Sequence, residues 1–254
     1  MDPSLAEARL AGRVPPAGWT PPRPDRLRDA VRTARVVAGL MASVALDRAA
    51  RGDSTTADGL ARIRTDFRAR ARQLGVTVRV EGVERVPREG GVVFMWNQTS
   101  HLDHLVLPLA IPRPFHTTYN NEVRRFPIYG AYLARTDHFW IDRTDETQWR
   151  AQLALAAARV QAGACVLISP EGTRSWDGRL LPMKRGAFAL ARAAQRPIVC
   201  VAVRGARALL PRGRLAVRPG TIEVELCPPI PYDATTEPNL EQLVIAAFEA
   251  ARCG

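Results

Sequence analysis

The sequence predicts an α/β fold, a mixed or largely parallel sheet flanked by helices, with an N-terminal helical pair. Short apolar runs alternate along the chain with longer amphipathic stretches, as in strands that are joined by helical crossovers. Of the 254 residues, 46% are hydrophobic, enough for one sizeable core. The part before residue 76 shows helical periodicity and no strand pattern.

Residues 1–26 form a proline-rich N-terminus that we expect to be disordered. Because they lack a basic stretch followed by an apolar core, no secretory signal is indicated. Apolar residues at three- and four-residue steps predict one helix over 27–50 and a second over 57–74. The longest uncharged run of the first helix, 36–46, is too short to span a bilayer, which takes roughly 20 residues.

Two roles for this helical pair stay open at the level of the sequence. Amphipathic helices usually pack their apolar face on a core. Alternatively, the apolar face lies in a membrane interface while the many arginines contact anionic headgroups.

From residue 76 onward the patterns of strands and helices alternate. Strands are expected at 76–80, 91–96, 115–119, 138–142, 164–168, 198–203 and 221–226. Helices are expected at 104–110, 122–134, 145–161, 184–194 and 238–252. A proline cluster at 228–231 separates the last strand from the last helix.

The formal net charge of +11 suits a nucleic acid, an anionic lipid or an anionic substrate. The basic residues are spread along the chain without interleaved aromatics, which disfavours binding of single-stranded nucleic acid. The four cysteines stand alone, so neither a metal site nor a disulfide framework is indicated. Cys165 and Cys200 lie in apolar runs and are expected to be buried.

Four segments in a fixed order resemble the motifs of the lysophosphatidic acid (1-acylglycerol-3-phosphate) acyltransferase family. They are Asn-Gln-Thr-Ser-His-Leu-Asp at 97–103, Phe-Trp-Ile-Asp-Arg at 139–143, Ser-Pro-Glu-Gly-Thr-Arg-Ser at 169–175, and the apolar run 198–203. The resemblance covers about residues 76–232. It implies a peripheral or monotopic enzyme at the cytoplasmic face of a membrane, with residues 27–75 as a membrane-association element and 76–254 as the α/β acyltransferase domain.

The resemblance also implies the reaction. An acyl group passes from acyl-CoA or acyl-carrier protein to the hydroxyl of a lysophospholipid, most simply 1-acylglycerol 3-phosphate, which gives phosphatidic acid. The partners are therefore a phospholipid surface, a lysophospholipid acceptor and an acyl donor, with no nucleic acid. No metal or organic cofactor is implied.

The first motif departs from the family pattern at the catalytic base. The family has Asn-His-x-Ser-x-x-Asp, in which the histidine takes the proton of the acceptor hydroxyl and the aspartate orients the imidazole; here Gln98 stands at the base position and Asp103 matches. A carboxamide is no general base, and losing one costs roughly 10²–10⁴-fold in rate. His101 is a candidate substitute base, but a packing or substrate-lining role is favoured for it.

Substrate-binding roles are implied for Arg143, which would hold the acceptor phosphate, and for a set in and after the third motif: Glu171, Gly172, Thr173, Arg174 and Lys184. Further departures are Asn121, where relatives often carry lysine, and Ser169, where they usually carry phenylalanine. The alternative function is therefore a catalytically impaired member, a pseudoenzyme that binds lipid or acyl-CoA without efficient turnover.

Overall fold

The computed structural model describes residue 8 and residues 14–20, 25–46, 54–125 and 136–253. The helices are α2 (Leu27–Leu46), α3 (Ala57–Leu74), α4 (Asp103–Ala110), α6 (Glu146–Gln161), α7 (Arg185–Ala194), α8 (Ala206–Leu209) and α9 (Leu240–Cys253). The strands are β1 (Val76–Glu81), β2 (Val92–Trp96), β3 (His116–Asn120), β4 (Phe139–Ile141), β5 (Cys165–Ile168), β6 (Ile198–Arg204) and β7 (Gly220–Leu226).

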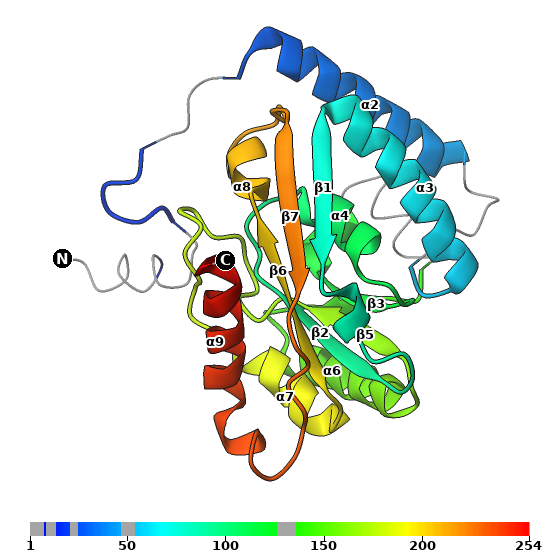
Figure 1. The fold of residues 1–254 in the computed structure, drawn as a ribbon, viewed down its shortest axis with the longest axis vertical. Helices are drawn as coiled ribbons and strands as arrows, with labels where there is room; N and C mark the ends of the chain where they lie inside the picture. The colour runs from blue at the N-terminus through cyan, green and yellow to red at the C-terminus, as the bar shows by residue number, and fades with distance from the viewer. Residues whose placement is uncertain (1–7, 9–13, 21–24, 47–53, 126–135, 254) are drawn as a thin grey trace.

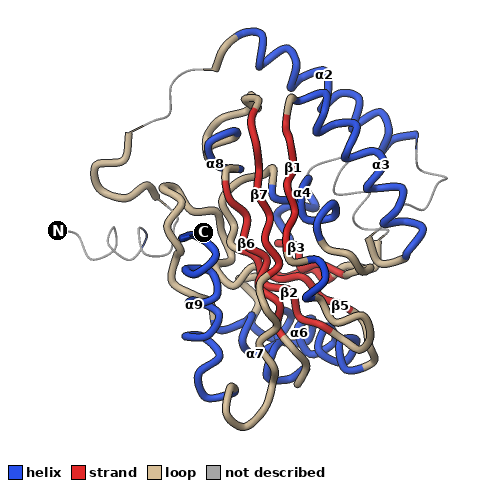
Figure 2. The backbone as a smooth tube through the Cα atoms, viewed as in Figure 1, coloured by secondary structure: helices blue, strands red, loops and turns tan. Residues whose placement is uncertain are grey.

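The described strands form one seven-stranded sheet in the order β1-β7-β6-β2-β5-β3-β4. Only β6 and β7 pair antiparallel, so β1 and β7 run opposite to the other five strands. Figure 2 shows the strands running through the middle of the molecule with helices on both sides. The mixed, largely parallel α/β sheet expected from the sequence is confirmed.

Each central strand buries both of its faces, which explains its uninterrupted apolar run. Val92 and Phe94 of β2 face a core cluster shared with α3 and α4, whereas Val93 and Met95 face a second cluster shared with α6, α7 and α9. Cys165 and Cys200 are buried, as expected. The sheet is therefore the middle layer of three. Because helices cover both of its faces, we expect a site in the loops at the ends of the strands.

Most expected elements are present with small shifts of their ends, but two expectations need correction. Asn121–Arg125 forms a 3₁₀ turn instead of the start of an α-helix over 122–134, and residues 126–135 lie outside the described part. The short helix α8 was not expected at all. Residues 47–50 of the first expected helix and much of the N-terminus also fall outside the described residues, so disorder over 1–26 stays a prediction.

Helix α3 packs on the body of the protein and lends its apolar face to the core. Thr56 caps its first turn and Gly75, at φ 72°, closes its last, while Leu60, Ala71 and Leu74 are buried. Figure 1 shows α3 beside β1 and α4, with α2 lying along its outer side. Helix α3 therefore packs on the core, which is the first of the two roles that the sequence left open.

Helix α2 is fixed by polar contacts to α3 and to the loop before β7. Arg70, 6% exposed, donates to the carbonyls of Val36 and Gly39 in α2. The Thr33 hydroxyl accepts the N–H of Val217 at 2.8 Å. The opposite side of α2 carries apolar residues in solvent, with Leu27 80% and Val31 42% exposed.

Among the described residues, no helix combines the length and the apolar character that crossing a bilayer would take.

The contact between Thr33 and Val217 predicts that Thr33→Val destabilises the protein by about 1–3 kcal/mol, because the buried N–H of Val217 loses its acceptor. Urea unfolding measures the effect. The matched control is Thr65→Val, since the exposed Thr65 hydroxyl bonds only Ala61 of its own helix, and this change should leave the unfolding free energy nearly unaltered. Equal losses for both variants would contradict the proposed docking of α2.

Candidate active site

The motif segments meet at one edge of the sheet. Residues 97–103 follow β2, residues 142–143 follow β4 and residues 169–175 follow β5. These three strands are parallel members of one sheet, so their carboxyl ends point to the same side. Ligands of open α/β sheets bind at this edge. The fold thus places the quoted motifs where a binding site is expected.

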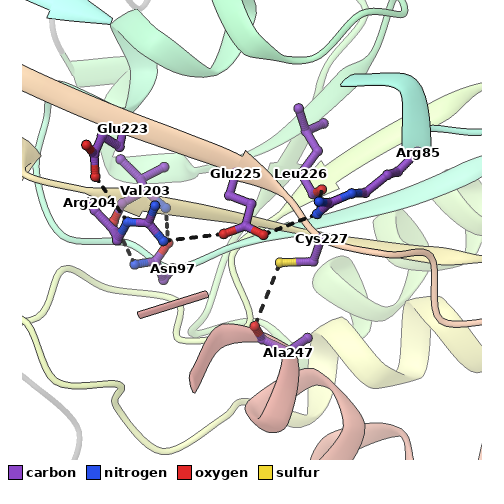
Figure 3. A network of polar contacts seen from close by, with 9 residues as sticks. All are labelled: Arg85, Asn97, Val203, Arg204, Glu223, Glu225, Leu226, Cys227 and Ala247. Carbon is purple, nitrogen blue, oxygen red and sulfur yellow. Dashed lines mark hydrogen bonds and ion pairs between the residues drawn. The ribbon is translucent and has the colours of Figure 1, made fainter. Parts of the chain in front are cut away.

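Asn97 fixes the exit of the chain from β2. Its side-chain amide donates to the Val203 carbonyl at 3.0 Å and accepts the Val203 N–H at 2.7 Å, as Figure 3 shows. The residue is 6% exposed, and its amide extends the ladder between β2 and β6 by one pair. Asparagine suits this position because its carboxamide matches the donor and acceptor of a peptide unit. The backbone position that precedes Gln98 is therefore fixed.

Glu171 joins the loop after β2 to the loop after β5. Its carboxylate accepts the Gln98 N–H at 2.9 Å and the Leu181 N–H at 2.7 Å, and the residue is 1% exposed. On the carbonyl side of the same residue, the Ser175 N–H donates to the Gln98 carbonyl at 2.9 Å. A buried carboxylate is tolerated because N–H donors compensate the lost hydration. The backbone of residue 98 is held on both sides.

Asp103 organises the turn between β2 and α4. Its carboxylate is fully buried and accepts the N–H groups of Thr99 at 2.8 Å and Ser100 at 3.0 Å. Burial raises the pKa of Asp103 to about 7, although these hydrogen bonds and the nearby Arg174 act in the opposite direction. Within the described chain, no hydrogen bond joins Asp103 to the side chain of Gln98 or to His101. Its visible task is to hold the turn.

The two histidines of this region differ in their surroundings. His101 is exposed over part of its surface, and desolvation of the rest, followed by the charges of Arg174 and Arg212, lowers its pKa to about 4. Burial likewise lowers the pKa of His104 to about 4, and its ring lies 6.1 Å from both Trp96 and Tyr119. Imidazoles with such pKa values are neutral near pH 7 but weak bases, because general bases work best with pKa values near the operating pH.

Gly172 lies between two cationic side chains. At φ +65° it has a left-handed backbone, and a Cβ there would lie 3.5 Å from Lys184 Cγ and 3.8 Å from Arg143 Nη2. The Arg143 guanidinium also donates to the Gly172 carbonyl. The second and third motifs and Lys184, which the sequence singled out separately, are thus brought together. Both side chains thus border the space where a Cβ of residue 172 would lie, Lys184 with its aliphatic stem and Arg143 with its guanidinium.

Arg174 completes the charged edge, next to the half-buried Thr173. Burial, followed by the charge of Arg212, lowers the pKa of Arg174, while Asp103 opposes the shift. Arg212 donates to the Arg174 carbonyl at 2.9 Å. No sequence motif marks Arg212, because it lies in a loop after α8, and its contact joins positions far apart in the chain.

Three further polar groups lie at the same edge. Asn121 donates to the Asp142 carboxylate at 3.1 Å, which ties the 3₁₀ turn after β3 to the residue before Arg143. Ser169 Oγ and Trp96 Nε1 are buried without a hydrogen-bond partner among the described residues. Both follow the paired residues Met95 and Ile168 of β2 and β5, so they occupy neighbouring register positions. Unpaired buried polar atoms are rare, and here they border the candidate site.

The chain is similar in sequence to known acyltransferases. A family model described as Acyltransferase matches residues 77–204. The 1-acyl-sn-glycerol-3-phosphate acyltransferase of Cocos nucifera is 30% identical over 172 residues, which are 67% of this chain and 55% of that protein. The enzyme of the same name from Limnanthes douglasii is also 30% identical, over 67% of this chain and 60% of its own length.

This chain therefore spans less than two thirds of the length of these plant relatives. Among solved structures, the 1-acyl-sn-glycerophosphate (LPA) acyltransferase PlsC from Thermotoga maritima is similar with a TM-score of 0.71 at 20% identity, covering 90% of this chain and 96% of that one. This likeness concerns the fold. Because the family model matches half of the sequence, including the segments that converge at the sheet edge, the chain belongs to the acyltransferase family.

Proposed function

We propose that the protein moves an acyl group from an acyl thioester to the hydroxyl of a lysophospholipid, most simply 1-acylglycerol 3-phosphate, in phospholipid biosynthesis. The names of the plant relatives support the acceptor class. The observation that carries the proposal is the convergence of two basic residues from separate segments, Arg143 and Lys184, on the space beside Gly172. A phosphate bound there would lie beside the loop that holds residue 98, because Glu171 joins both segments.

In this reaction the acceptor oxygen attacks the thioester carbonyl, its proton passes to a base, and the C–S bond breaks to release the thiol. The family resemblance puts the base at residue 98, where this chain has glutamine. The Gln98 side chain makes no hydrogen bond to any described residue, and the main chain is held without it. The second candidate function, a binding protein with impaired turnover, is favoured by this one substitution.

The held backbone predicts that Gln98→His raises the rate of acyl transfer to lysophosphatidic acid by roughly 10²–10⁴-fold, the usual contribution of a general base. Release of free thiol from several acyl-CoAs measures the rate. Gln98→Leu is the control, because it changes the side chain without adding a base and should stay at the level of the natural protein.

High activity of the natural protein with little gain from Gln98→His would show that another base serves. His101→Ala then tests the exposed imidazole. Since the pKa of His101 is lowered to about 4, a rate that depends on its neutral form should stay level from pH 8 down to about 5 and fall only as the pH approaches 4. A loss of rate around pH 6.5 would exclude His101 with this pKa.

The proposed phosphate site predicts that Arg143→Ala raises the KM for lysophosphatidic acid by about 10- to 100-fold, because a charge-assisted hydrogen bond contributes about 1.5–3 kcal/mol. Steady-state kinetics in the Gln98→His background give the readout. The control is Arg192→Ala on α7, where the arginine pairs with Glu237 instead of facing Gly172. An unchanged KM in Arg143→Ala would contradict this placement of the phosphate.

Membrane association through residues 27–75 is also proposed, and the exposed side of α2 supports it. Leu27 and Val31 are in solvent there, with Arg28 and Arg35 exposed on the same helix. Apolar residues that enter a lipid interface beside basic ones match the energetics of peripheral binding. The docked face of α2 points the other way, so this side is available to a bilayer.

Val31→Asp should therefore weaken binding to vesicles that contain anionic phospholipid by about 10-fold or more, because burial of a valine contributes about 1.5–3 kcal/mol. Vesicle co-sedimentation measures it. Leu155→Asp on α6 is the matched control, since Leu155 is 48% exposed and Val31 42%, and it should bind as the unchanged protein does. Equal loss in both variants would exclude a specific role for α2.

A further inference from the structure

A cavity of about 280 Å³ lies next to the candidate active site and takes no part in the chemistry described above. Its walls come from three places: the N-terminal segment, the loop after the third motif, and α8 with the loop that follows it. The side chains that matter are Trp19, Trp176, Arg207, Arg212 and Arg218. Two indoles and three guanidinium groups thus surround one space.

The aromatic wall is built by contacts between distant parts of the chain. The rings of Trp19 and Trp176 meet edge to face, with centroids 5.1 Å apart at 72°. The Arg212 guanidinium lies over the Trp176 ring, 4.2 Å from its centroid. Such aromatic and guanidinium surfaces favour flat π-systems as ligands.

The charge of the wall selects for an anion. No carboxylate lines the cavity within the described chain, whereas three arginines do. Burial lowers the pKa of Arg212, so its charge is partly desolvated. Multiple phosphate oxygens would compensate these charges through bidentate hydrogen bonds. The ligand class is therefore a planar aromatic group that carries phosphates.

The size of the cavity and its position next to the candidate active site further restrict the class of ligand. Small-molecule pockets measure about 300–1,000 Å³, and this cavity of about 280 Å³ lies just below that range, which suits part of a small molecule, such as one nucleotide, and not a folded partner. A carrier protein would need a patch of about 800 Å² on this surface instead. The cavity adjoins the active site directly, because Arg212 contacts both Trp176 and the carbonyl of Arg174.

We propose that this cavity binds the phosphorylated adenine nucleotide of coenzyme A, so that acyl-CoA and not acyl-carrier protein is the donor. The proposal rests on the proposed function for its link to acyl transfer. The nucleotide stacks on the Trp19 and Trp176 wall, its phosphates meet the arginines, and the thioester arm runs past Arg174 toward residue 98.

Isothermal titration with three probes tests the binding directly: free coenzyme A, adenosine 3′,5′-bisphosphate and pantetheine. The first two should bind and pantetheine, which lacks the nucleotide, should not. Arg207→Ala and Trp176→Leu should each weaken coenzyme A binding by about 10-fold or more. Arg207 is the cleaner site, because it makes no hydrogen bond or ion pair with any described residue, so its loss leaves no group unpaired.

Arg150→Ala is the matched control. Arg150 also lies over an indole, 5.1 Å from the ring centroid of Trp149, but on α6 and away from the cavity. It should leave coenzyme A binding unchanged. Circular dichroism and urea unfolding confirm that each variant is folded.

The proposal is overturned if the folded natural protein does not bind coenzyme A, or if both cavity variants bind it as tightly as Arg150→Ala does. Loss of binding to anionic vesicles in those variants, without any coenzyme A binding, would assign the cavity to a lipid headgroup and overturn it as well. Coenzyme A binding without turnover in any variant would instead contradict the proposed function and support the cavity assignment.

Discussion

The buried carboxylate of Glu171 is the interaction on which the arrangement of the site depends. Loops at strand ends carry backbone N–H groups that no ladder satisfies, and a buried one needs an acceptor. Glu171 accepts two of them, from Gln98 and Leu181, and so fixes two loops with one side chain. Asn97 and Asp103 do the same for the exit of β2 and for its turn. Several polar side chains of the first and third motifs therefore form hydrogen bonds with the backbone of the loops.

Because these hydrogen bonds involve main-chain groups of residue 98, the side chain at this proposed base position can change without loss of the loop arrangement. Every described contact of residue 98 runs through its main chain, to Glu171 on one side and Ser175 on the other. The side chain is therefore free to vary at little cost to the fold. The same reasoning assigns Glu171 a positioning role, because both of its oxygens are engaged and the residue is 1% exposed.

The sequence predicted best what depends on local pattern and worst what depends on distant contacts. The central strands are buried on both faces, so their apolar runs marked them clearly, and α3 was placed at 57–74 as observed. The 3₁₀ turn at 121–125 and the short α8 have too few residues for a helical period. The motifs identified the site, but the meeting of Trp19 with Trp176 has no signature in either segment.

The positions of the arginines explain how the net charge of +11 is used in the protein. Several arginines have structural roles. Arg64 donates to carbonyls at the end of α4, and Arg113 donates to carbonyls of the loop before β2. Others lie around Gly172 and Trp176, at the carboxyl ends of the parallel strands, where their charge would attract anionic ligands. The proposed reaction joins a phosphate-bearing acceptor to a phosphate-bearing donor, and two such anions bound on one side of the sheet would account for the arginines there.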